Sequence, residues 1–408
     1  MNTHSVIAEI QAHAWLYLSM PLIAAFVGYV TKLLALEMMF RPLEFVGIRP
    51  YLGWQGVVPR KAEKMAGTAT DLLLGNIIRV DELVQRLDPV RMVREVEPLL
   101  QGASEDLARE IGERYIPGFW KLLPEFARKA TVRRVQAEIP RVAVLLWQDI
   151  ALRPSHYLDM RHLLVANLVR DKALLNDIFR RIGGKEFVFF RNAGFWFGLL
   201  LGLVQLACWM TWHQPWLLPA FGAFVGLTSD WIALQMMFRP LYPKKFLGIT
   251  LHGKFIARQK EVARDYASLI ARELLTPANM IEELLRGPFA DRVVDLLQQH
   301  VRNATDEQLG LGKPLVVAAM GSSRYGEIRR HIVVRLLELL PQTSREIEQY
   351  ALDALDINNT IVARMDLLTP EQFEGLLRPA FKEDEKTLVL CGAVLGFAVG
   401  ELQVHLMI

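Results

Sequence analysis

The chain has 408 residues and a net charge of only +3, from 47 Lys and Arg against 44 Asp and Glu. Its mean hydropathy of +0.21 is unusual for a soluble domain while its charged fraction, 22%, is ordinary, so the apolar residues are expected in a few membrane-spanning stretches. The small net charge gives no support for a nucleic-acid partner, and the position of Cys208 and Cys391 inside apolar runs excludes a disulfide-stapled extracellular fold.

Four stretches are apolar enough to cross a bilayer, which takes about 20 residues. In chain order, the predicted spans are 14–40, 192–212, 214–238 and 387–408. Between them lie two long polar blocks, 41–191 and 239–386. The sequence therefore predicts an integral membrane protein with four transmembrane helices and two large extramembrane domains.

The distribution of basic residues predicts the orientation. Every Lys and Arg except Lys32 falls within 41–191 or 239–386. Four crossings place these two blocks on one side of the membrane, and the positive-inside rule assigns that side to the cytoplasm. Both chain termini and the short connection between the second and third spans are then expected outside.

The chain also carries an internal repeat with a constant offset of 198 residues. The segment Met38–Leu43 recurs as Met236–Leu241, and the match extends to the end of each half. There, Gly194, Gly198, Gly202 and Gln205 correspond to Gly392, Gly396, Gly400 and Gln403. Each half is predicted to be a span running inward, a helical block and a span running outward, so a pseudo-two-fold axis should follow the membrane normal.

Both polar blocks are predicted to be helical and to contain no strand. Apolar residues recur at close to a 3.6-residue period in 61–87 and 328–352. Thr276-Pro277 and Thr369-Pro370 each place a capping residue before a first-turn proline, which indicates a helix start. The amphipathic helices are expected to form two cytoplasmic helical domains, either as compact bundles or as extended stalks that dimerise.

Each inward span is predicted to end at a Phe-Arg-Pro element, because proline disfavours helix at the residue before it. Arg41 and Arg239 then lie where a guanidinium reaches lipid phosphate. They are candidate lipid-headgroup anchors, either as simple stop signals or as parts of a dedicated lipid or partner site.

Three charges lie inside the predicted spans, where charges are costly unless they are paired or reach an interface. Lys32 and Asp230 occupy equivalent repeat positions with opposite signs, so we expect either an interhelical ion pair or two side chains that reach the cytoplasmic interface. Glu401 is either a functional carboxylate or a residue that reaches the outer interface.

The glycines of the two Gly-x-x-x-Gly-x-x-x-Gly runs, at 194–202 and 392–400, are candidate helix-packing residues. A substrate path lined by small residues is the alternative. In 128–141, five basic residues either contact anionic lipid headgroups or form a solvated helix face. No metal-ligand cluster, phosphate-binding loop or nucleophile motif occurs, so the sequence predicts neither a cofactor nor an enzyme.

The motifs resemble a known family. The element Gly-Tyr-Val-Thr-x-Leu-Leu-Ala-Leu-x-Met-Met-Phe-Arg-Pro at 28–42, followed by Gly-Val-Val-Pro-Arg-Lys at 56–61, is similar to the bacterial membrane family known as domain of unknown function 445. The segments 376–385 and 392–396 resemble its C-terminal signature. The resemblance implies a helical inner-membrane protein and no known reaction. It also marks a departure, since Lys32 and Asp230 stand where the family usually has Asn.

Two functions follow as hypotheses. The first is a non-enzymatic, membrane-anchored scaffold or envelope-organising protein that acts through its cytoplasmic helices. The alternative is an oligomeric transporter or lipid-handling protein, which the parallel repeats and intramembrane charges favour. The expected partners are membrane lipids, further copies of the chain and a cytoplasmic protein.

Overall fold

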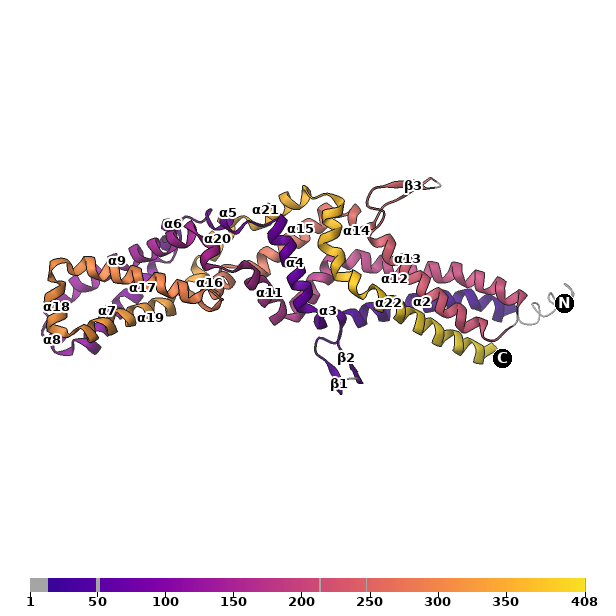
Figure 1. The fold of residues 1–408 in the computed structure, drawn as a ribbon, viewed down its shortest axis with the longest axis horizontal. Helices are drawn as coiled ribbons and strands as arrows, with labels where there is room; N and C mark the ends of the chain where they lie inside the picture. Colours follow the sequence, from indigo (N-terminus) through magenta and orange to yellow (C-terminus); the bar gives the residue numbers. More distant parts are fainter. Residues whose placement is uncertain (1–13, 49–51, 213, 247, 408) are drawn as a thin grey trace. The chain divides into compact units, whose positions relative to one another are not determined.

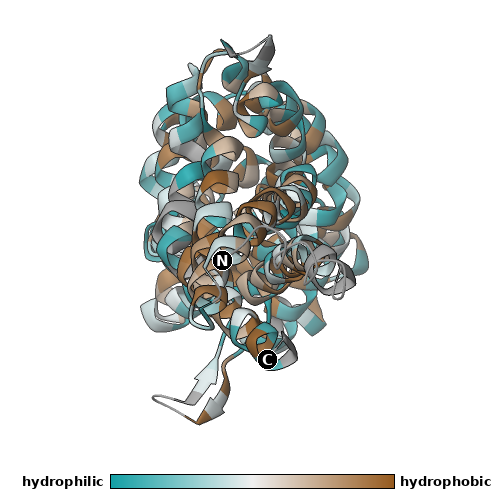
Figure 2. Ribbon diagram, turned by 90° about the vertical axis from the view of Figure 1, so that its right-hand side faces the viewer, coloured by the Kyte–Doolittle hydropathy of each residue, from teal (hydrophilic) through white to brown (hydrophobic). Residues whose placement is uncertain are grey.

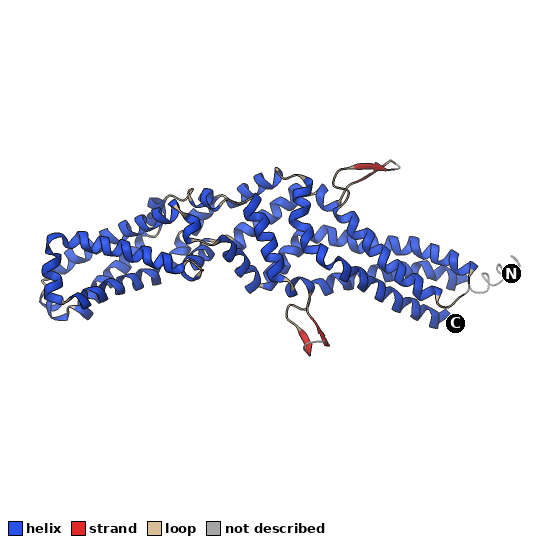
Figure 3. Ribbon diagram, viewed as in Figure 1, coloured by secondary structure: helices blue, strands red, loops and turns tan. Residues whose placement is uncertain are grey.

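The fold is almost entirely helical. The computed structural model describes residues 14–48, 52–212, 214–246 and 248–407, and within these ranges the chain is helix apart from two β-hairpins and short connections (Figure 3). The predicted helical fold is confirmed, and the expectation that the blocks contain no strand is wrong. The strands have three residues each, too few to produce the alternation that reveals a strand in a sequence.

The chain forms two compact units, each built from separate stretches of sequence. Unit 1 comprises Met1–Leu72, Leu168–Tyr266 and Val362–Ile408, and unit 2 comprises Leu73–Asn167 and Ala267–Ile361. Both predicted blocks, 41–191 and 239–386, therefore contribute to both units. Amphipathic helices of one half bury their apolar faces against helices of the other half, so neither block forms a compact unit of its own.

Unit 1 contains the apolar helices. Its main elements are α2 (Ala14–Phe40), α3 (Val57–Arg60), α12 (Lys172–Thr211), α13 (Leu217–Phe238), α14 (Lys254–Ala257) and α22 (Pro370–Met407), with most of α4 (Ala62–Asn76) and α15 (Gln259–Leu269) (Figure 1). The helix α2 packs along α12, and α13 packs along α22. Further contacts of α12 with α13 and of α2 with α22 close a four-helix bundle. Figure 2 shows hydrophobic residues on the helices nearest the chain termini.

Within the described part of the chain, three helices are long and apolar enough to cross a membrane: the Ser19–Phe40 part of α2, α12 and α13. The fourth predicted span falls on a shorter apolar stretch, Val389–His405, inside α22. As predicted, α2 and α13 end directly before Arg41-Pro42 and Arg239-Pro240, and both of these peptide bonds are cis.

The other two helices of the bundle extend well beyond the predicted spans. The helix α12 begins at Lys172 rather than near 192, with the Asp171 side chain accepting a hydrogen bond from the Leu174 N–H at 2.9 Å. The helix α22 begins at Pro370, and Thr369 and Gln372 cap its start reciprocally, as the Thr-Pro signal predicts. The polar sequence before each of these spans also favours helix. The helix therefore continues across the point where the apolar stretch begins, and only the residue composition changes there.

Two antiparallel hairpins follow the ends of α2 and α13. The first pairs β1 (Val46–Ile48) with β2 (Leu52–Trp54), and the second pairs β3 (Lys244–Phe246) with β4 (Ile249–Leu251). Each hairpin closes at its base through a backbone hydrogen bond of 2.9 Å, from Gly56 to Pro42 and from Gly253 to Pro240. A Cβ on either glycine would collide with the last residue of the preceding helix, so this closure depends on glycine.

Unit 2 is a bundle of helices drawn from both halves. From the first half come α5 (Val80–Val84), α6 (Pro89–Glu95), α7 (Glu97–Tyr115), α8 (Pro117–Leu122), α9 (Glu125–Leu152), α10 (Pro154–Tyr157) and most of α11 (Met160–Arg170). From the second half come the π-helical turn Ile270–Leu274, α16 (Pro277–Arg286), α17 (Ala290–Leu309), the 3-10 turn Gly310–Gly312, α18 (Lys313–Met320), α19 (Ser322–Glu346), α20 (Glu348–Leu355) and part of α21 (Ile357–Asp366). The helix α16 starts at the predicted Thr-Pro signal, where the Thr276 hydroxyl accepts from the Asn279 N–H at 3.2 Å.

Candidate functional site

The structure brings Lys32 and Asp230 together in the four-helix bundle of unit 1. The Nζ of Lys32 on α2 lies 2.6 Å from Oδ1 of Asp230 on α13, and the two side chains are 0% and 2% exposed. The same Nζ donates to the Ser229 hydroxyl at 2.9 Å and lies 5.4 Å from the centre of the Phe190 ring. Of the two arrangements that the sequence allows, the structure has the ion pair.

The glycine runs provide the space that this pair occupies. The stem of Lys32 lies where a Cβ on Gly194 would be, and the Asp230 carboxylate lies where a Cβ on Gly392 would be. The opposing helices also touch backbone to backbone, because a Cβ on Gly28 would overlap the Gly194 carbonyl. All six predicted packing glycines, at 194, 198, 202, 392, 396 and 400, face a neighbouring helix this closely.

The bundle contains a second polar pair, formed by two residues that the sequence identifies only as equivalent positions of the repeat. Gln205 on α12 and Gln403 on α22 are both buried, and the Gln205 amide donates to the Gln403 carbonyl oxygen at 3.4 Å. They line a cavity of about 20 Å³ between the four helices, room for roughly one water molecule. The sequence offers one signal for this pair, namely two glutamines at equivalent positions of two apolar segments.

The remaining predicted residues are exposed. Arg41 lies 3.7 Å from Glu37, and Arg239 lies 3.5 Å from Glu374, measured from each Nε to a carboxylate oxygen. Both guanidinium groups are more than half exposed at the ends of their helices. Glu401 is exposed on α22, and the structure places it in neither polar pair.

A network of charges joins α12 to α15 in unit 1. Arg258 lies 2.5 Å from the buried Glu186 and 2.9 Å from Glu261, while Lys185 lies 2.5 Å from Glu261. Hydrogen bonds from Arg258 and then from Lys185 lower the pKa of Glu261 to about 2. The carboxylate therefore stays charged at any physiological pH and links the two helices.

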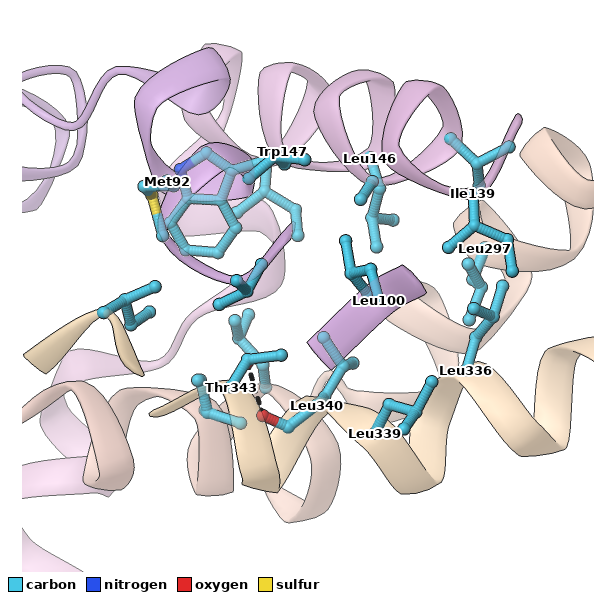
Figure 4. Close-up of a pocket in the computed structure, with 18 of the residues that line it drawn as sticks. Met92, Leu100, Ile139, Leu146, Trp147, Leu297, Leu336, Leu339, Leu340 and Thr343 are labelled. Atoms are coloured by element: carbon cyan, nitrogen blue, oxygen red, sulfur yellow. Dashed lines mark hydrogen bonds between the residues drawn. The ribbon is translucent and has the colours of Figure 1, made fainter. Parts of the chain in front are cut away.

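Unit 2 contains an apolar cavity that the sequence did not predict. Its volume is about 110 Å³. Side chains from α6, α7, α9, α16, α17 and α19 line it, and Figure 4 shows Leu100, Leu146, Leu297 and Leu336 around the enclosed space. The Thr343 hydroxyl in its wall already donates to the Leu340 carbonyl at 2.7 Å (Figure 4). The cavity therefore suits an apolar occupant.

A second cavity adjoins the first. It measures about 310 Å³ and shares Ile139, Val142 and Leu336 with the first cavity. Its lining is mixed, since Arg134 and Glu138 accompany the apolar residues. Arg134 belongs to the basic stretch 128–141, whose helix lines both cavities. The two spaces together pass from an apolar interior to a polar rim, an arrangement typical of sites for amphipathic molecules.

One polar atom in the wall of the apolar cavity lacks a partner. The indole Nε1 of Trp147 on α9 is buried and has no hydrogen-bond acceptor among the described residues. A buried N–H without an acceptor costs about 1–3 kcal/mol, but this nitrogen is too deeply buried to face the cavity, so the wall of the cavity stays apolar.

Among the described residues of unit 2, three His–carboxylate pairs connect the two halves of the chain. His300 on α17 lies 2.8 Å from Asp149 on α9, and His331 on α19 lies 3.2 Å from Glu110 on α7. The third pair joins His162 to Glu283 at 2.9 Å, and burial raises the pKa of Glu283. Among the described residues, no group of three or more His, Cys, Asp or Glu side chains is placed to hold a metal ion.

Together, the apolar four-helix bundle and its buried charge pair are typical of a helical membrane protein. Comparison with known proteins indicates the same class of protein. The chain is 21% identical to a UPF0754 membrane protein of Nostoc sp., over 96% of both chains. It is 21% identical to one of Rippkaea orientalis, over 97% of this chain and 96% of the relative, and 22% identical to one of Thermosynechococcus vestitus, over 95% and 96%.

The family described as "Protein of unknown function (DUF445)" matches residues 220–344, which include most of α13, the second hairpin and much of α19. The chain is thus similar to a family of membrane proteins. No solved structure matches it significantly.

Proposed function

We propose that the protein binds a lipid acyl chain in the apolar cavity of unit 2. The observation that carries this proposal is a cavity with apolar walls, next to a larger space with a polar rim, in a protein that resides in a membrane. The Thr343 hydroxyl in the wall is committed to the Leu340 carbonyl, so we assign binding and no chemical step to this cavity.

The proposal includes the membrane arrangement. We infer four spans in the bacterial inner membrane, with both termini outside and unit 2 in the cytoplasm. The confinement of Lys and Arg to 41–191 and 239–386 supports this orientation. The packing of the apolar part of α22 along α13 supports the fourth span.

We also propose that the halves are a tandem repeat. Support comes from equivalent contacts 198 residues apart, since Gly28 meets Gly194 while Gly226 meets Gly392. Each half also continues from its Arg-Pro bond into a β-hairpin. The ion pair and the Gln205–Gln403 contact each join equivalent positions of the two halves.

A scaffold function is the second candidate. The close backbone packing of the four bundle helices and the small size of the space between them favour a structural role for the bundle. A transport path through the bundle would need a different arrangement of these helices. Lipid binding in unit 2 and a scaffold function are distinguished by whether the purified protein retains a lipid.

Native mass spectrometry of the full-length protein in mild detergent tests the proposal and also reports the predicted homo-oligomeric state. We expect a retained lipid or fatty acid in fixed stoichiometry. A diazirine-bearing fatty acid should crosslink to peptides of α6, α9 and α19. The substitution Ala143→Phe places a ring in the cavity and should reduce crosslinking roughly tenfold or more, because a filled cavity leaves no room for the chain.

The matched control is Ala137→Phe, on the same helix but exposed and outside both cavity walls. It should leave crosslinking unchanged. Equal crosslinking of the Ala143→Phe protein and the wild type would reject the cavity as the lipid site and leave the scaffold candidate.

A further inference from the structure

The end of α13 and the start of the second hairpin line an open groove with an apolar end and a basic end. The groove has a volume of about 550 Å³. Its apolar wall is the side of α13 that carries Trp231, Ile232 and Met236. In Figure 1 the β3–β4 hairpin extends away from the helices near the end of α13.

The basic end lies where α13 stops. Arg239 follows the last helical residue, and Lys244 is the first residue of β3. Both are exposed, and both line the groove. Tyr242 lies between them in the chain, and its hydrogen bond with Glu371 of α22 raises the pKa of the phenol. This contact holds the groove wall to the start of α22.

The position of the groove decides what can occupy it. Because the hairpin base closes on Pro240, the basic end is tied to the end of α13, a helix apolar enough to cross a membrane. Trp231 is 52% exposed two turns earlier on that helix, at the depth where acyl chains begin if α13 crosses the bilayer. The groove thus presents cations at headgroup depth and an apolar surface at acyl depth.

We propose that this groove binds one anionic phospholipid from the surrounding bilayer. Arg239 and Lys244 contact the headgroup phosphate as charge-assisted hydrogen-bond donors, and the first part of an acyl chain lies along Trp231, Ile232 and Met236. This inference rests on the membrane orientation proposed above but not on the cavity of unit 2.

The other half of the chain contains a natural comparison. At the positions 198 residues earlier, Val46 replaces Lys244 and Glu44 replaces Tyr242. Glu44 forms an ion pair with Lys172 at 2.9 Å, and Val46 is 64% exposed. Among the described residues, the position equivalent to Lys244 thus carries no cation beside Arg41, so we expect no matching anionic-lipid site in the first half.

Native mass spectrometry after reconstitution in phosphatidylcholine nanodiscs, with and without phosphatidylglycerol, tests this proposal. We expect one phosphatidylglycerol retained per chain in preference to phosphatidylcholine. Lys244→Glu should reduce this retention roughly tenfold or more, the scale expected from reversing one lysine charge beside an anionic lipid. Lys244→Arg, which keeps the charge, should preserve this retention, and Arg41→Gln should leave it intact.

Three outcomes would overturn the inference: equal retention of both lipids, unchanged retention in Lys244→Glu, or displacement of the lipid by millimolar glycerol phosphate. The last result would identify a soluble phosphate compound as the ligand. The Ala143→Phe protein separates the two proposals, because it should lose the lipid of unit 2 while it keeps the phosphatidylglycerol of the groove.

Discussion

The Lys32–Asp230 pair is the most deeply buried charge pair among the described residues. Removing two charges from water is costly, and an ion pair compensates only when its geometry is good and its other polar atoms are bonded. Here Ser229 accepts a second hydrogen bond from Lys32, and the glycines allow the helices to approach closely enough. The pair therefore fixes which face of α2 meets α13.

Neutralising one partner should lower the stability of the protein more than neutralising both. Lys32→Met leaves Asp230 buried without a counter-charge, and we expect the free energy of unfolding to fall by about 3–5 kcal/mol. The double variant Lys32→Met/Asp230→Asn should recover most of this loss. Thermal unfolding of the purified protein in detergent, followed by size-exclusion fluorescence, measures the difference.

An exchange of the two residues is the complementary experiment. Lys32→Asp/Asp230→Lys should be more stable than either single neutralisation, although the tight fit of each side chain against its own glycine limits the recovery. A double-neutral variant no more stable than Lys32→Met alone would show that the charges are not coupled.

At the scale of single elements, the glycine faces determine how closely the bundle helices approach. Without Cβ atoms, the backbones of α13 and α22 come into contact at Gly226 and Gly392, and dispersion attraction then replaces the hydrophobic effect, which is absent between helices in lipid. A leucine-faced pair of helices would be just as apolar and could not reach this distance.

A single added methyl group should therefore be sufficient to disturb the bundle. In Gly226→Ala the new Cβ would overlap the Gly392 carbonyl, so the two helices must separate, and we expect a loss of about 1–3 kcal/mol. This loss of stability should be measurable as a lower melting temperature of the purified protein in detergent. The control is Ala220→Leu, a larger addition at an exposed position of the same helix, and an equal loss in this control would argue against close packing as the cause.

At the scale of the whole molecule, the two halves depend on each other. The apolar cavity is lined by α6, α7 and α9 from the first half and by α16, α17 and α19 from the second. The His300–Asp149 and His331–Glu110 pairs also cross between the halves. Each half alone would expose one side of these apolar walls to water.

This dependence predicts the behaviour of a divided chain. Residues 1–212 and 213–408, produced separately, should aggregate or be degraded, since each would leave its amphipathic helices without a partner. Produced together as two chains, they should co-purify and recover the retained lipid. Stable, monodisperse halves in size-exclusion chromatography would contradict the interleaved arrangement.

Much of this protein follows from local sequence. The apolar stretches, the proline stops after Phe40 and Phe238 and the caps at Thr276 and Thr369 act within a few residues, so they could be located without a structure. The pairing of Lys32 with Asp230 was within reach because an isolated charge inside a span needs a partner and the offset of 198 identified one.

Other features depend on contacts between distant residues, and only the tertiary structure decided them. Amphipathic periodicity shows that a helix must bury one face but not which helix covers it, so the mixing of both halves in unit 2 was not predictable. The hairpins are too short for a periodic signal. The cavity of unit 2 and the groove beside α13 arise where packed surfaces leave space, a property of three-dimensional fit that no local pattern in the sequence encodes.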